Sequence, residues 1–184
     1  QYKPFVVLGY KDAREIMYRN LYNVNDSVFC VYTDHKVYLD PNTSDAVAYV
    51  FRNGEADGIN CEHTFPQSLG AKEGNARSDM HHLYPTRVAV NTTRSNLPFG
   101  EIDDAETVKW FYLDSEMSQV PQQNIDNYSE WINSRFEPRE DHKGNMARAM
   151  FYFAAIYRDQ ADLTYFEQQK KDLCKWHSLD PVDE

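Results

Sequence analysis

The chain has 184 residues, of which 41% are hydrophobic and 14% are aromatic, so it can build one domain around a sizeable core. Its 7 glycines and 8 prolines argue against a fibrous or disordered protein, and no apolar run approaches the roughly 18 residues that a membrane span needs. The net charge of −10 argues, on its face, against a nucleic-acid partner.

The negative charge is unevenly distributed along the chain. Residues 100–130 hold eight acids and one lysine, a net charge of −7, whereas residues 52–99 hold five acids and five bases and are neutral. The acidity therefore weakens the case for a nucleic-acid partner without excluding one for the neutral segment.

The first residue and the cysteines bear on processing and compartment. The chain begins at Gln1 rather than Met, which is the pattern expected of a processed or trimmed product. Three cysteines, Cys30, Cys61 and Cys174, are compatible with one disulfide and one free thiol or with three free thiols. This number does not fix the redox compartment.

Hydrophobic spacing predicts the elements of the first fifty residues. Residues 28–39 alternate apolar and polar side chains on both sides of TDHK, which predicts a hairpin. Residues 46–51, AVAYVF, fit either a short strand or the end of a helix. A helix is predicted over residues 11–22, where four apolar residues recur at helical spacing: Ala13, Ile16, Met17 and Leu21.

Helices dominate the predicted second half. A helix is expected over residues 86–95, because Pro85 is tolerated at a helix start and SNLP ends it. Residues 100–135 look irregular, and a last helix is predicted over 164–177. A buried helix is predicted over 141–158 from one apolar face: Met146, Ala149, Met150, Phe153 and Tyr157. Early strands and late helices predict a single α+β domain over residues 1–184.

The stretch NCEHTFPQSLG, residues 60–70, contains the first candidate site residues. Glu62 and His63 are adjacent, and adjacent residues of a regular strand point to opposite faces. The pair can therefore share one centre only at a strand end or in a loop, and Pro66 makes a loop plausible directly afterwards.

The stretch SDMHHLYPTRVAVNTTRSN, residues 78–96, supplies the complementary groups. In a helix over 86–95, Arg87, Asn91 and Arg94 would share one face. Asparagine is a poor helix-interior residue, so it is costly at this position unless it has a role there. An amide oxygen between two guanidinium groups is suited to binding a phosphate and a hard metal ion.

These residues suggest a metal-assisted hydrolytic centre. Glu62 and Asn91 would hold one Mg²⁺, which prefers oxygen ligands and keeps several waters. His63 would then deprotonate a water for attack on phosphorus, since a neutral imidazole is suited to this at neutral pH.

Other interpretations compete with this one. A Glu-His pair alone is common and is usually a solvated edge. Four residues could also form a zinc set, although their spacing lacks the usual pattern and a thiolate suits Mg²⁺ poorly: Cys61, His63, His81 and His82.

Two further residues, His82 and Arg148, are candidates for substrate contact. His81 and His82 would face opposite ways on a strand, so at most one reaches the centre, and His82 is assigned to the wall of the site. Arg148 lies off the apolar stripe of its helix and is a candidate for a phosphate contact, although an ion pair is the more common fate of such a residue.

From residue 60 to the end, the chain resembles the bacterial endonuclease I family, non-specific nucleases with a ββα-metal (His-Me finger) core. Besides the two stretches above, the resemblance rests on FEPREDHKGNMARAMFYFAAIY (136–157) and LCKWHSLDPVDE (173–184). It implies a ββα-metal core within a mainly helical domain. Disulfide-rich members have more than three cysteines, so their bridges are not carried over.

The resemblance also implies roles for residues. Glu62 and Asn91 match the metal ligands, His63 the general base, and Arg94 an arginine for which a phosphate contact is the natural role; Arg87 is a further candidate. The implied cofactor is one Mg²⁺, or Mn²⁺ or Ca²⁺, per active site. The implied activity is hydrolysis of DNA, and often RNA, to 5′-phosphate ends by a secreted or periplasmic protein.

Two rival functions stay open at this level. One is a nucleic-acid-binding module without catalysis, and the other is a zinc-stabilised extracellular interaction protein. The sequence leaves the oligomeric state and the preference for DNA or RNA open.

Overall fold

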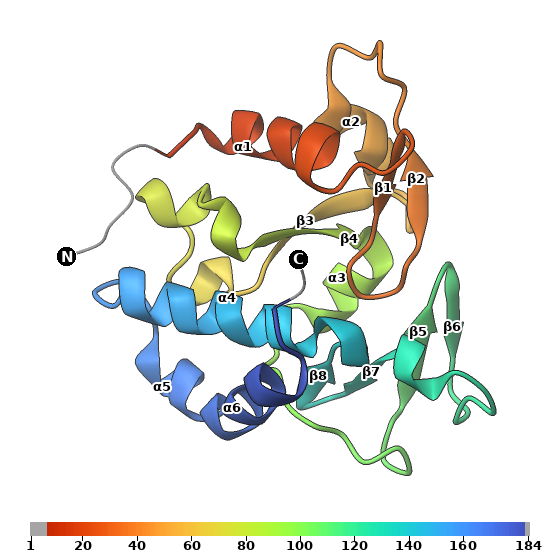
Figure 1. The fold of residues 1–184 in the computed structure, drawn as a ribbon, viewed down its shortest axis with the longest axis vertical. Helices are drawn as coiled ribbons and strands as arrows, with labels where there is room; N and C mark the ends of the chain where they lie inside the picture. The colour runs from red at the N-terminus through yellow and green to blue at the C-terminus, as the bar shows by residue number, and fades with distance from the viewer. Residues whose placement is uncertain (1–6, 183–184) are drawn as a thin grey trace.

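The computed structural model describes residues 7–182; residues 1–6 and 183–184, and with them the end of the C-terminal DPVDE stretch, lie outside the described part. Helices and short antiparallel sheets alternate along the chain (Figure 1). In chain order they are α1 (Tyr10–Ile16), β1 (Ser27–Phe29), β2 (Lys36–Tyr38), α2 (Ala46–Phe51), β3 (Ile59–His63), β4 (Leu83–Arg87), α3 (Val88–Arg94), β5 (Lys109–Tyr112), β6 (Ser115–Met117), β7 (Ser129–Ile132), β8 (Arg135–Glu137), α4 (Lys143–Ile156), α5 (Leu163–Glu167) and α6 (Lys170–Leu179).

The N-terminal predictions are largely confirmed. α1 continues into a π-helical turn over Met17–Leu21, and β1 pairs antiparallel with β2 as the predicted hairpin. The π turn buries Tyr18 beside Met17 and leaves Leu21 exposed, so the buried face differs from the predicted one. Residues 46–51 form a helix, which Asp45 caps by accepting a hydrogen bond from the Ala48 amide at 2.8 Å.

Two strands and a helix form the centre of the molecule. β3 and β4 pair antiparallel, with Glu62 opposite Tyr84 and Cys61 opposite Pro85, and α3 follows β4 directly. The helix predicted over 86–95 is therefore shorter than expected and begins at Val88. Pro85 favours extended backbone before it, and its carbonyl accepts a hydrogen bond from the Val31 amide at 3.0 Å, which stabilises the strand.

The prediction that residues 100–135 are irregular is wrong in part. Four short strands form an antiparallel sheet in the order β6-β5-β7-β8. Trp110 and Phe111 are fully buried on β5. Strands of three or four residues give too little alternation to be recognised from sequence.

The predicted buried helix is α4, and the core is built around it. Met146, Met150 and Phe153 on α4 are fully buried, and the Phe153 ring stacks on Phe65 at a centroid distance of 4.3 Å. α4 lies between the β3–β4 pair and α5–α6 (Figure 1). The helix predicted over 164–177 is divided into α5 and α6.

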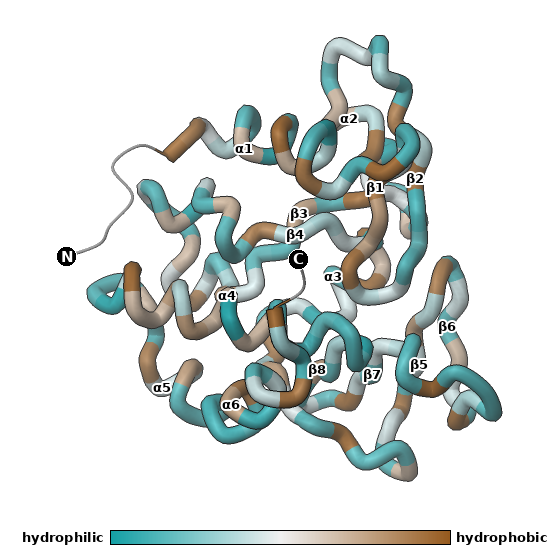
Figure 2. Tube along the Cα trace, viewed as in Figure 1, coloured by the Kyte–Doolittle hydropathy of each residue, from teal (hydrophilic) through white to brown (hydrophobic). Residues whose placement is uncertain are grey.

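Hydropathy agrees with this arrangement, and the mixture of helices and antiparallel sheets agrees with the predicted α+β class. Hydrophobic residues recur through α4 and the strands, while hydrophilic residues gather in outer loops such as the one beyond β5 (Figure 2). Among the described residues, no helix is long and apolar enough to cross a membrane.

Candidate active site

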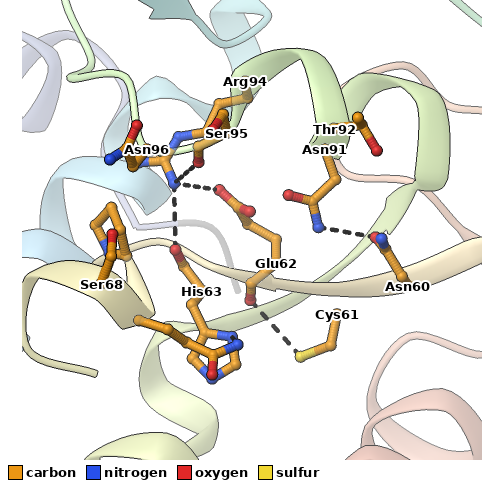
Figure 3. Close-up of a pocket in the computed structure, with 12 residues that line it drawn as sticks. Asn60, Cys61, Glu62, His63, Ser68, Asn91, Thr92, Arg94, Ser95 and Asn96 are labelled. Carbon is orange, nitrogen blue, oxygen red and sulfur yellow. Dashed lines mark hydrogen bonds and ion pairs between the residues drawn. The ribbon is translucent and has the colours of Figure 1, made fainter. Parts of the chain in front are cut away.

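One cleft brings together the polar residues of both sequence motifs. It has a volume of about 470 Å³ and lies where the end of β3 approaches α3 (Figure 3). Glu62 and His63 are the last two residues of β3, so the pair lies at a strand end as predicted. Asn91 and Arg94 reach the same cleft from α3.

The Glu62 carboxylate is 2% exposed and is anchored on one side. Its Oε1 accepts a hydrogen bond from the Tyr32 hydroxyl at 2.9 Å and lies 3.0 Å from Arg94 Nη1. Burial raises the pKa of Glu62, while the Arg94 charge and the Tyr32 hydrogen bond lower it. Within residues 7–182 no side chain forms a hydrogen bond or ion pair with Oε2, which points toward Asn91 (Figure 3).

The Asn91 amide is oriented by Asn60. Asn91 Nδ2 donates to Asn60 Oδ1 at 2.8 Å, and Asn60 Oδ1 also accepts from Thr86 Oγ1 at 3.2 Å. With Nδ2 held on that side, Asn91 Oδ1 faces Glu62 (Figure 3). Asn60 has no role in the sequence-based prediction, although strand alternation places it on the same face of β3 as Glu62.

The His63 ring has a defined tautomer. Nε2 lies 2.9 Å from the Arg77 carbonyl oxygen, which can only accept, so Nε2 carries the proton and Nδ1 carries a lone pair. Nδ1 lies 3.4 Å from Gln67 Nε2. Burial, followed by the neighbouring His82, lowers the pKa of His63 to about 3. The ring is therefore neutral at neutral pH.

Arg94 is buried, with 1% of its surface exposed, and it binds protein groups. Beside its contact with Glu62, Nη1 donates to the His63 carbonyl at 3.3 Å, and Nη2 donates to the Thr64 carbonyl at 2.9 Å. Nη2 also donates to the Tyr165 hydroxyl at 3.0 Å. In this structure Arg94 anchors Glu62, and a contact with substrate phosphate stays a prediction.

Arg87 and Arg148 do not join this centre. Arg87 donates through Nε and Nη2 to Asp57 Oδ1, at 2.9 and 2.5 Å. Arg148 donates to the Asp180 carbonyl at 2.7 Å and to Asn145 at 2.6 Å. The prediction that Arg87 shares a helix face with Asn91 is wrong, because Arg87 ends β4. Both predicted phosphate contacts would require these hydrogen bonds to break.

His82 is fully buried behind His63 and does not line the cleft. It lies on a 3₁₀ turn, Met80–His82, instead of a strand, and its Nε2 donates to the Ala76 carbonyl at 2.6 Å. Its ring meets the His63 ring edge-on at a centroid distance of 5.5 Å. The predicted substrate contact of His82 is therefore not made in this structure, because a ring without exposed surface can only support His63 from behind.

We expect His82→Gln to change how stability depends on pH. Burial lowers the pKa of His82 to about 4, below its ordinary value of 6.5, so unfolding takes up a proton between these two pH values. As the pH falls from 7 to 5, wild type should lose about 2 kcal/mol of unfolding free energy relative to the variant. Urea unfolding of both proteins at pH 7 and pH 5 measures this effect. If the difference in unfolding free energy between wild type and variant is the same at both pH values, a neutral buried ring is contradicted.

The alternative zinc set of Cys61, His63, His81 and His82 is not formed in this structure. Cys30, Cys61 and Cys174 are free thiols. In the described part of the chain, no three His, Cys, Asp or Glu side chains are placed to hold a metal ion. His81 instead lies 2.7 Å from Asp79 Oδ1 and stacks on Tyr152.

Comparison with known proteins places the chain in a family. Residues 7–184 match the Endonuclease I family. The chain is similar to the extracellular ribonuclease of Bacillus subtilis (strain 168), with 28% identity over 170 residues, covering 79% of this chain and 53% of that protein. It is also similar to the extracellular ribonuclease of Bacillus amyloliquefaciens, with 28% identity over 156 residues, covering 77% and 48%.

The chain spans about half the length of these curated relatives. The class that the matches define is that of nucleases, which hydrolyse phosphodiester bonds. Within that class, the chain belongs to the endonuclease I family.

Proposed function

We propose that this chain is a metal-dependent endonuclease that hydrolyses DNA, and RNA as well, with little sequence preference. One observation carries the proposal: Glu62, His63 and Asn91 line one cleft, and among the described residues Glu62 Oε2 and Asn91 Oδ1 have no hydrogen-bond partner, while His63 Nδ1 has only the Gln67 amide at 3.4 Å. The relatives' name, extracellular ribonuclease, supports RNA as a substrate and action outside the cell.

The proposal includes the architecture and the cofactor. β3, β4 and α3 would be the ββα-metal (His-Me finger) core, with one Mg²⁺, or Mn²⁺ or Ca²⁺, held by Glu62 and Asn91. The donor set fits, because a carboxylate and an amide oxygen are hard ligands. The protein partners of Glu62 and Asn91 contact Glu62 Oε1 and Asn91 Nδ2, which leaves Glu62 Oε2 and Asn91 Oδ1 for the ion. When bound, the ion would neutralise charge on the phosphoryl oxygens and on the leaving oxygen.

The residues of the chain divide the remaining work. His63 Nδ1 takes a proton from water, and the Arg77 carbonyl, hydrogen-bonded to Nε2–H, stabilises the imidazolium that forms. The water oxygen bonds to phosphorus while the bond to the 3′ oxygen breaks, and the leaving 3′ oxygen takes a proton from a solvent water, which gives a 5′ phosphate and a 3′ hydroxyl. Although burial makes His63 a weak base in the free protein, an anionic phosphodiester beside it raises its pKa.

Recognition would depend on phosphate rather than on bases. The groups that face the cleft are suited to phosphate oxygens and their counter-ion, which every nucleotide presents alike. Selectivity for sequence should therefore be weak, and binding should weaken as the salt concentration rises.

Removal of divalent ions should abolish cleavage, because the anionic Glu62 and the neutral Asn91 cannot themselves neutralise the negative charge of the transition state. We expect a supercoiled plasmid and a structured RNA to be cut in Mg²⁺, left intact in excess EDTA, and cut again when Mg²⁺ is restored. Nicks with 5′-phosphate and 3′-hydroxyl ends should be resealed by DNA ligase.

Circular dichroism in EDTA provides the control, since the fold should persist without the ion. Undiminished cleavage in EDTA would sink the metal-dependent mechanism. Absence of cleavage with every divalent ion would favour a nucleic-acid-binding module without catalysis.

A further inference from the structure

A second hollow adjoins the active-site cleft between α1 and α2. Its volume is about 430 Å³, and it shares two lining residues with the cleft, Asn60 and Cys61. Val47 and Phe51 contribute apolar surface to it, and Arg14 also lines it. A nucleic-acid strand bound across the active site could therefore continue directly into this hollow.

Two arginines lie against the ring of Tyr10, which lines the hollow together with Arg14. The guanidinium carbons of Arg14 and Arg77 lie 4.1 and 4.6 Å from the centroid of the Tyr10 ring. That ring lies 5.5 Å from the His63 ring. We call Tyr10, Arg14 and Arg77 the Tyr10 cluster. Each cation is attracted by the ring, but the two like charges repel each other.

Neither arginine of the cluster has a carboxylate partner among the described residues. Within the described part of the chain the Arg14 side chain donates only to the Tyr10 carbonyl, at 3.3 Å, whereas Lys11 on the same helix pairs with Asp45 at 2.6 Å. Both guanidinium groups therefore lie beside the one Tyr10 ring without a described carboxylate to neutralise them. A bound anion would relieve the repulsion between them.

We propose that the Tyr10 cluster binds a phosphate of the nucleic-acid strand next to the scissile phosphate, and that the hollow takes the base of that nucleotide. The inference rests on the proposed function, since it concerns the same nucleic-acid strand that the active site would cleave. The hollow is within the size range of ligand sites, roughly 300–1,000 Å³. Phe51, which is 40% exposed and lines the hollow together with Arg14, offers a stacking surface.

Binding of a fluorescein-labelled single-stranded oligonucleotide, about 12 nucleotides long, tests the inference in EDTA at several KCl concentrations. Arg14→Gln and Arg77→Gln should each weaken binding about tenfold and lower the salt slope by about 0.7. Arg77→Gln keeps the main-chain carbonyl that accepts from His63. Phe51→Ala should also weaken binding about tenfold, with an unchanged slope, because stacking involves no counter-ion release.

The matched control is Arg135→Gln, which removes the same charge from an exposed position on β8, outside the cleft and the hollow. If the Arg14 and Arg77 variants bind with the affinity and slope of this control, the inference is overturned, whether or not wild type cleaves nucleic acid. If wild type binds no oligonucleotide, the inference also fails, and a cleavage assay in Mg²⁺ then shows whether the proposed function fails with it.

Discussion

His63→Ala should lower the turnover number on plasmid DNA by roughly 10²–10⁴-fold, the usual contribution of a general base. The variant loses the ring nitrogen that carries the lone pair, while Glu62 and Asn91 keep their anchoring contacts with Arg94 and Asn60. Mg²⁺ binding should therefore change little, and calorimetric titration of the metal can verify this separately from the rate.

Two controls make the result specific to the base. His81→Ala removes a histidine that is exposed, pairs with Asp79 and does not line the cleft, so its rate should stay near that of wild type. Added imidazole should partly restore the rate of His63→Ala, because a small base can enter the space that the ring leaves. A His63→Ala rate within a few-fold of wild type would show that another group activates the water.

The sequence predicted those elements that local spacing determines. The β1–β2 hairpin and α4 were both recognisable, because their alternation and their apolar face extend over enough residues. The β5–β8 sheet was not, since Trp110 and Phe111 are buried by partners distant in sequence. The sequence predicts helix for residues 86 and 87, which end the strand at 83–87, because Pro85 suits both a helix start and an extended segment.

The same division applies to the site. Glu62, His63 and Asn91 belong to motifs whose residue types reveal their chemistry, and the structure brings all three to one cleft. The fate of each arginine depends instead on tertiary partners: Asp57 for Arg87, Glu62 for Arg94 and Asp180 for Arg148. A guanidinium group in a sequence does not reveal whether it faces a substrate or a buried carboxylate.

Arg94→Met should destabilise the fold by about 3–5 kcal/mol, because it leaves the Glu62 carboxylate buried without its ion-pair partner. Tyr32 would still donate to Oε1, but one neutral hydrogen bond does not compensate for a buried charge. A substrate-binding arginine at the protein surface would behave differently, since its loss would raise KM and leave the unfolding free energy nearly unchanged.

A double-mutant cycle separates these roles. We expect Glu62→Gln combined with Arg94→Met to recover most of the lost stability, because both buried charges are then removed, while the double variant stays inactive without its metal ligand. Urea unfolding of wild type, both single variants and the double variant, all in EDTA, gives the coupling energy without a contribution from bound metal. If Arg94→Met unfolds with the wild-type free energy and only its KM rises, Arg94 is a phosphate contact and Glu62 does not depend on it.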